Sequence, residues 1–188
     1  IPELSPCINF YQHNPNHDKD IFEHTMAVLD NIEPKLELRL AALFHDIGKG
    51  THYFQKYIRK ESVEEKLKSH AGISAILFLY YHIQRETVKE WEEVIVSMAY
   101  AILKHHGNIE NYSDINNYLS GTNKELLKHQ YEAFDYSTMI DMCTRLNLDE
   151  EIIQEIFDGD SEKFLLTVSK FLKDRRYRIS IKKIQYKR

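Results

Sequence analysis

Apolar residues recur three and four positions apart along most of the chain, which is the spacing of one buried helical face. The first such run can be capped by Asp18 or Asp20, and its apolar positions are Ile21, Phe22, Met26, Leu29 and Ile32. A second helix is predicted over 35–46, between Pro34, which suits a helix start, and Gly48, which suits a helix end. It is expected to be central because it is apolar on most faces, with the inward positions Leu36, Leu40, Leu43 and Phe44.

The same pattern predicts three more helices. Thr51 is placed to cap a short one. A charged connector over 61–68 then leads to a strongly apolar helix over 73–83. The next helix is predicted over 87–106, with Gly107 placed to stop it, and its inward positions are Trp91, Val94, Ile95, Met98 and Ile102.

The rest of the chain predicts further helices. Between 113 and 171 several amphipathic helices are separated at Ser120-Gly121, Phe134-Asp135 and Asp158-Gly159-Asp160, and 178–184 fits a short strand. Only 6 Gly and 4 Pro among 188 residues leave few turns for a β architecture, so an all-α bundle with additional C-terminal helices is expected. We predict a single domain with a core over about 20–110, a helical extension over about 111–173 and a basic tail over 174–188.

Composition excludes several classes of protein. Cys7 and Cys143 are too few for a disulfide framework and lack the spacing of a thiolate metal site. The longest apolar stretch, 94–103, is interrupted by Ser97 and is shorter than the roughly 20 residues of a membrane span. The chain starts at Ile1 without a methionine, so some sequence is expected to precede it, and no signal peptide is visible. We therefore expect a soluble cytoplasmic protein with no membrane partner.

Charge is unevenly distributed. Nine Lys or Arg and one Asp over 170–188 give this tail +8, which leaves −12 on the other 169 residues of a chain with a formal net charge of −4. A basic tail is typical of a nucleic-acid arm, a link to a neighbouring domain or a solvated end. The acidic body is unfavourable for binding phosphate unaided, because phosphate contacts usually come from Lys and Arg.

Histidines form the most informative pattern. Two doublets lie just before glycines, at Gly48 and Gly107, where a fraying helix end lets both side chains turn toward one centre. The intervals between the groups are each about one helical hairpin, so the groups can converge in a bundle. The candidate residues are His24, His45, Asp46, His70, His105 and His106.

Imidazole and carboxylate ligands suit Mn, Fe, Co, Ni or Zn, whereas a magnesium site is richer in oxygen. Asp46 has two carboxylate oxygens and can bridge two metals. Taken alone, His24 fits a hydrogen-bonded core residue better than a ligand, and an isolated His-His pair fits a surface. The combination in one small helical chain favours a histidine-rich metal centre.

The motifs that surround these residues point to a family. They are FHDIGK at 44–49, YFQKY at 53–57, SHA at 69–71, ISA at 73–75 and ILKHHG at 102–107. With them the chain resembles the HD-domain metal-dependent phosphohydrolases, which are named after the His-Asp doublet. Within that superfamily it looks most like the HD nuclease of type I CRISPR interference systems, over about 21–107. The stretch 12–48 also looks like the HD region of tRNA nucleotidyltransferases, but that likeness fades beyond it.

The resemblance implies the fold of an HD-domain helical bundle and the roles of the ligands. His24, His45 and Asp46 would hold one divalent ion, and Asp46 would bridge to a second ion held by His70, His105 and His106. One or two ions are expected, of Mn, Ni, Co, Fe or Zn, with Mg as an option. Family members add a final Asp after the His-His pair. This chain does not show that pattern, and its nearest candidates are Asp135 and Asp141, so the first site is one protein ligand short.

The resemblance also implies a nuclease that hydrolyses DNA phosphodiester bonds, preferably in single strands. Its partners would be the CRISPR-associated helicase domain and the RNA-guided surveillance complex, and this chain can be a fragment of a larger helicase-nuclease. Asp46 is the expected catalytic residue together with Lys49, which either contacts a phosphate oxygen or is a solvated cation at a helix end. Two alternatives stay open: an HD-type phosphohydrolase of nucleotides or cyclic phosphates, and a catalytically degenerate HD module that bridges partners. Tyr53, Phe54 and Tyr57 could stack on bases, although an aromatic cluster at helical spacing favours a core.

Overall fold

The protein folds as a bundle of α-helices. The computed structural model describes residues 21–85, 88–107, 119, 122–134, 154 and 159–174. In these ranges the helices are α1 (Ile21–Asn31), α2 (Leu36–Phe44), the 3-10 helix η2 (Ile47–Gly50), α3 (His52–Ile58), α4 (Ala71–Gln84), α5 (Val88–Leu103), α7 (Thr122–Glu132) and α10 (Ser161–Asp174). The predicted all-α class, with additional helices toward the C-terminus, is confirmed.

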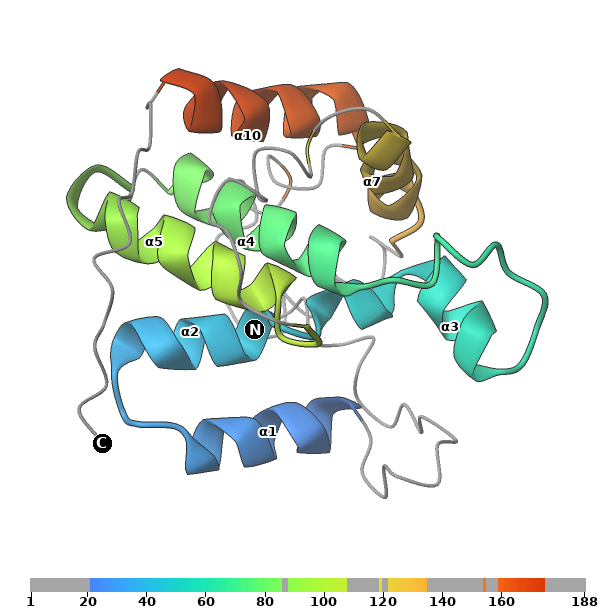
Figure 1. Ribbon diagram of the computed structural model, residues 1–188, viewed down its shortest axis with the longest axis horizontal. Coiled ribbons are helices and arrows are strands. Elements are labelled where there is room, and N and C mark those ends of the chain that lie inside the picture. The colour runs from blue at the N-terminus through green and yellow to red at the C-terminus, as the bar shows by residue number, and fades with distance from the viewer. Residues whose placement is uncertain are drawn as a thin grey trace.

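The central helix is α4, which packs against α5, α2, α7 and α10 (Figure 1). Ten of its fourteen residues are buried, because it is apolar on nearly every face. The helices form layers, with α10 above α4 and α5, and with α2 and α1 below them (Figure 1). Helix α2, which was predicted to be central, packs between α1 and the α4–α5 layer, but only its Ala42 and Phe44 are buried. Its expected inward residue Leu36 is 71% exposed.

Helix α5 carries a second departure from the predicted pattern. Trp91 has non-helical backbone angles, φ −121° and ψ 21°, and its side chain is 56% exposed instead of facing inward. Since the helix kinks there, the regular periodicity does not extend to Trp91, whereas Ile95 and Ile102 are buried as predicted. The helix ends at Leu103, and Gly107 N donates to the Lys104 carbonyl at 2.8 Å in the turn that follows.

Two helices of the predicted C-terminal extension pack on the core. Tyr131 of α7 stacks on Phe164 of α10 with ring centroids 4.2 Å apart, and Phe164 also meets Tyr80 of α4 at 5.0 Å. The strand predicted at 178–184 and the tail beyond residue 174 lie outside the described residues, and the predicted domain boundaries stay predictions. None of the described helices is both long and apolar enough to cross a membrane.

His82 of α4 gives the fold a pH dependence. Burial, together with the charge of Arg85, lowers the pKa of His82 to about 4. The unfolded chain binds this proton first as the pH falls, so stability is lost between about pH 6.5 and pH 4, by about 3 kcal/mol in total. We expect denaturant titrations at several pH values to show a shallower decline in the free energy of unfolding for His82→Gln than for the wild type. Parallel declines in the two proteins would contradict this assignment.

Candidate metal centre

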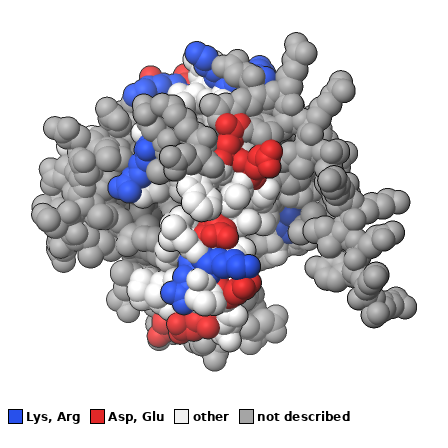
Figure 2. Space-filling model, turned by 90° about the vertical axis from the view of Figure 1, so that its left-hand side faces the viewer, with Lys and Arg blue, Asp and Glu red and all other residues white. Residues whose placement is uncertain are grey.

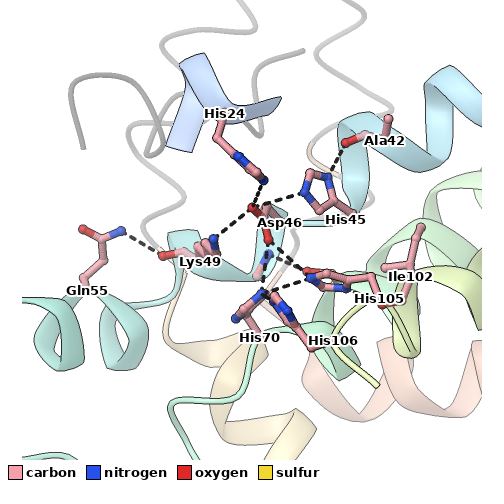
Figure 3. A network of polar contacts seen from close by, with 12 residues as sticks. His24, Ala42, His45, Asp46, Lys49, Gln55, His70, Ile102, His105 and His106 are labelled. Carbon is pink, nitrogen blue, oxygen red and sulfur yellow. Dashed lines mark hydrogen bonds and ion pairs between the residues drawn. The ribbon is translucent and has the colours of Figure 1, made fainter. Parts of the chain in front are cut away.

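Four chain segments bring the predicted ligands together around the Asp46 side chain (Figure 3). His24 comes from α1, and His45-Asp46 form the turn between α2 and η2. His70 is the N-cap of α4, and His105-His106 form the turn after α5. The six residues thus lie close together, as their sequence intervals predicted. His24 lies within α1, and the other five lie at or just beyond the ends of helices. Their roles as ligands remain a prediction.

One carboxylate oxygen of Asp46 faces the first group. His45 Nε2 lies 3.2 Å from Asp46 Oδ2, and His24 Nε2 lies 3.7 Å from the same oxygen. Lys49 Nζ is closer still, at 2.9 Å. The candidate ligand atoms of His24, His45 and Asp46 all lie within 4.8 Å of one another, so one ion could contact all three.

The other carboxylate oxygen of Asp46 faces the second group. Asp46 Oδ1 is 3.1 Å from His70 Nε2 and 3.5 Å from His105 Nε2. His70 Nε2 is also 3.3 Å from His105 Nε2 and 3.0 Å from His106 Nε2. This group offers four ligand atoms within 4.8 Å of one another, one more than the first group. A single aspartate therefore spans both groups.

The orientation of the imidazoles tests whether these residues fit a metal. His45 Nδ1 lies 2.5 Å from the Ala42 carbonyl, and His105 Nδ1 lies 2.7 Å from the Ile102 carbonyl. A carbonyl only accepts hydrogen bonds, so each Nδ1 carries a proton, and each Nε2 faces Asp46, to which it donates when protonated and presents a lone pair when it is not. Such second contacts orient metal-binding histidines.

The burial of the Asp46 carboxylate also fits a metal site. Its residue is 1% exposed, and neither oxygen accepts a well-formed hydrogen bond from the described residues. Lys49 places one positive charge at Oδ2, whereas Oδ1 faces the imidazole nitrogens of His70 and His105, where a cation would complete the contacts of the buried carboxylate. Nitrogen and carboxylate donors in this arrangement therefore fit a divalent transition metal.

The pKa shifts of Asp46, His70 and His106 agree with a role as metal ligands. Burial raises the pKa of Asp46, but contacts with His105, His45 and His70 outweigh it and hold that pKa well below the usual range. Burial lowers the pKa of His70, and burial with the neighbouring His105 and His70 lowers the pKa of His106 to about 4. At neutral pH Asp46 is ionised and His70 and His106 are neutral, which are the protonation states that bind metals. At His45 burial lowers the pKa, but the Asp46 contact reverses this and raises it overall.

Gly48 sits where the turn after Asp46 passes α4. Its N–H donates to Ser74 Oγ at 2.8 Å. A Cβ at this position would overlap the His70 carbonyl oxygen, Ile73 Cγ2 at 2.6 Å and Ser74 Oγ at 2.8 Å. The sequence predicted that Gly48 ends the second helix, but α2 ends at Phe44 and Gly48 lies within η2. The structure gives another reason for glycine, which is close packing against His70 and the residues that follow it.

Lys49 is buried, with 5% of its surface exposed, so the reading of Lys49 as a solvated cation was wrong. Its ammonium contacts Asp46 Oδ2, and its carbonyl accepts a 2.8 Å hydrogen bond from Gln55 Nε2 (Figure 3). The Lys49 ammonium also lies over the Phe54 ring, 5.7 Å from its centroid. Its predicted contact with a phosphate stays a prediction.

Gln130 supports the centre and was missed by the sequence reasoning. It is fully buried on α7, and its Nε2 donates to the carbonyls of Leu67, at 3.0 Å, and Ser69. These two bonds hold the connector that leads into His70. The signal in the sequence was a polar residue within the apolar stripe of α7, between Leu127 and Tyr131. The candidate final ligands Asp135 and Asp141 lie outside the described residues.

The unequal groups predict unequal metal affinities. The four-ligand group should hold an ion tightly, whereas an ion in the three-ligand group competes with Lys49 for Asp46 Oδ2. We expect isothermal titration with Mn²⁺ to show a tight and a weak step. His105→Ala should weaken the tight step by more than the roughly 10- to 100-fold loss typical of an outer-sphere partner, and His24→Ala should remove the weak step alone. Equal effects of both variants on one step would contradict two separate sites.

Comparison with known families gives one result that includes this centre. The family model described as HD domain matches residues 21–140, which is more than half of the chain and contains all six predicted ligands. Searches of curated proteins and of solved structures found no match. The match thus supports the superfamily suggested by the motifs and leaves the particular reaction open.

Proposed function

The chain belongs to the HD domain family, and from that premise we propose that it is a metal-dependent nuclease that hydrolyses single-stranded DNA in CRISPR interference. HD domains are generally metal-dependent hydrolases. The observation that carries the proposal is the shared carboxylate: Asp46 joins two groups of candidate metal ligands. Two adjacent ions are the arrangement used in many phosphodiester hydrolases.

Bound ions would offset the charge of the phosphate and activate water for attack on phosphorus. The chain's own residues would hold these ions and orient the substrate. The hydrogen bonds from the His45 and His105 rings to backbone carbonyls keep the two imidazoles in place before substrate arrives. Lys49, held by Asp46, is expected to contact a nonbridging phosphate oxygen, since its ammonium lies at the edge of the first group.

Access to the centre favours a polymer as substrate. A cleft of about 520 Å³ is lined by His70 and His106 and opens to solvent. An open cleft admits a strand that continues past the reacting phosphate, whereas a hydrolase for free nucleotides needs walls that enclose the base. This favours the nuclease over the nucleotide or cyclic-phosphate hydrolase.

Surface charge supports delivery of the DNA by a partner. Figure 2 shows acidic and basic side chains interleaved over the described part of one face, and ion pairs such as Lys35–Glu33, 3.2 Å apart in the α1–α2 connection, leave little net charge. Tight unaided binding of DNA needs many uncompensated Lys and Arg contacts. We propose that a CRISPR-associated helicase, with an RNA-guided complex, supplies the strand to this centre.

A direct assay tests the function. Purified protein is incubated with Mn²⁺, Ni²⁺, Co²⁺ or Mg²⁺ and with labelled single-stranded DNA, double-stranded DNA, RNA or cyclic nucleotides. Cleavage of single-stranded DNA that Asp46→Ala abolishes is the expected result. Hydrolysis of cyclic nucleotides alone would favour the second enzyme class, and inactivity with every metal would favour the interaction module.

A further inference from the structure

The cleft beside the metal centre has its own cationic lining. Besides His70 and His106, the residues that line the cleft include Tyr57, Lys68, Lys104 and one acidic residue, Glu65. Resting on the proposed nuclease function, we propose that this cleft binds the nucleotide next to the scissile bond, with the phosphate of that nucleotide on Lys68 and Lys104. The substrate class would then be an oligonucleotide, which carries a second phosphate beside the one that reacts.

Lys68 is held in position by the residues around it. Its Nζ lies 4.7 Å from the centroid of the Tyr57 ring, a cation–π distance, and 2.6 Å from Glu65 Oε1. The Tyr57 side chain is 46% exposed, so the ring that supports the ammonium is part of the cleft wall. The ammonium is therefore presented toward the cleft by an aromatic surface.

Glu65 occupies the position that a phosphate would take on Lys68. Its side chain is 84% exposed while that of Lys68 is 28% exposed, so the carboxylate reaches the ammonium from the solvent side. An exposed ion pair of this kind contributes little stability. A phosphate, with more charge and more acceptor oxygens, can displace the carboxylate at low cost.

Lys104 adds a second cation from a different element. It is half-buried in the turn after α5 and directly precedes His105 and His106. Because His70 and His106 line the cleft as well as the metal centre, an occupant of the cleft lies next to the reacting phosphate. A cleft of about 520 Å³ is in the usual range for small-molecule sites and exceeds what a lone phosphate requires.

A substrate with one phosphate would leave these lysines unused. A cyclic mononucleotide places its only phosphate at the metal centre, so it has no second phosphate to contact Lys68 and Lys104. An oligonucleotide places its next phosphate beside the first. The two cations therefore favour oligonucleotides over single diesters.

The first test measures binding rather than catalysis. Fluorescence anisotropy of a labelled twelve-residue oligo(dT) is recorded in Ca²⁺ buffer at several salt concentrations. In the double variant Lys68→Ala/Lys104→Ala, we expect weaker binding and a salt slope that is shallower by about 0.7 for each phosphate that the protein no longer neutralises. Lys66→Ala is the matched control, because Lys66 is exposed in the same connector and does not line the cleft.

A second variant acts in the opposite direction. Glu65→Gln removes the carboxylate that competes for Lys68, so oligo(dT) should bind more tightly than to the wild type. A misfolded protein cannot give this gain. An unchanged salt slope in the double variant, or an equal loss of affinity in Lys66→Ala, would overturn the proposal.

Hydrolysis separates this proposal from the proposed function. Where the protein cleaves DNA, the ratio of kcat/KM for oligo(dT) to that for bis(p-nitrophenyl) phosphate should fall in the double variant. An unchanged ratio would count against the subsite. A protein that hydrolyses neither substrate would refute the nuclease function, and the binding slopes would still decide whether the lysines contact phosphate.

Discussion

Replacing Asp46 by asparagine should abolish metal-dependent hydrolysis, with a fall in kcat on the order of 10³-fold or more, as for the loss of a main electrostatic group. Both ligand groups lose their shared anionic oxygen donor at once, because each group uses a different oxygen of this one side chain. Lys49 also loses its buried counterion. Leaving one charge of a buried pair unpaired costs about 3–5 kcal/mol, so the free energy of unfolding should fall too.

Two measurements separate these effects. Titration calorimetry reports metal binding, and denaturant titration without metal reports the stability change. His52→Gln is the matched control, since His52 is an exposed histidine of the neighbouring helix α3 outside both ligand groups, and it should keep the activity of the wild type. Retention of metal-stimulated cleavage by a folded Asp46→Asn protein would show that the centre lies elsewhere.

Gly48→Ala should be the most damaging change of a single methyl group. The added Cβ meets the backbone oxygen of His70 as well as side-chain atoms of Ile73 and Ser74. Backbone cannot rotate away, so the turn that carries Asp46 must move from the start of α4. We expect a loss of about 3 kcal/mol in the free energy of unfolding, at the upper end for overpacking, and weaker metal binding, because Asp46 and His70 separate.

Gly107→Ala provides the comparison for Gly48→Ala. Among the described residues other than its chain neighbours, no atom lies within 4 Å of a Cβ built at Gly107, although this glycine follows the His105-His106 doublet and Gly48 stands close after His45-Asp46. Thermal unfolding with and without Mn²⁺ should show Gly107→Ala close to the wild type and Gly48→Ala far below it. Similar midpoints for the two variants would contradict the packing argument.

Much of the fold follows from local patterns. The all-α class and the helix cap at Thr51 depend on residues that are neighbours in the sequence, so both could be predicted. Thr51 Oγ1 accepts a hydrogen bond from Phe54 N at 3.3 Å. The exposure of Leu36 and Trp91 could not be predicted, because periodicity identifies an apolar face without showing whether another element covers it. The burial of most of α4 could be predicted from its sequence in principle, since a helix that is apolar all round belongs in the interior.

Some features of the candidate site could likewise be predicted from the sequence, and others could not. Convergence of the His and Asp residues was predicted from doublets at helix ends and from their intervals. The contact of Lys49 with Asp46 and the packing of Gly48 against α4 depend on distances between segments, so neither follows from spacing alone. Gln130 lies some sixty residues beyond the connector that it holds, and a contact of that range leaves only a weak local signal.

The two hydrogen bonds of Gln130 also bear on the entropy of substrate binding. They fix the carbonyls of Leu67 and Ser69, the residues on either side of Lys68. Ordering the backbone of one residue costs about 1–2 kcal/mol, and here folding has already met that cost for the Lys68 backbone. A phosphate that arrives at Lys68 therefore immobilises only the tip of a side chain, and α7 acts as a preorganising element for a cleft that it does not line.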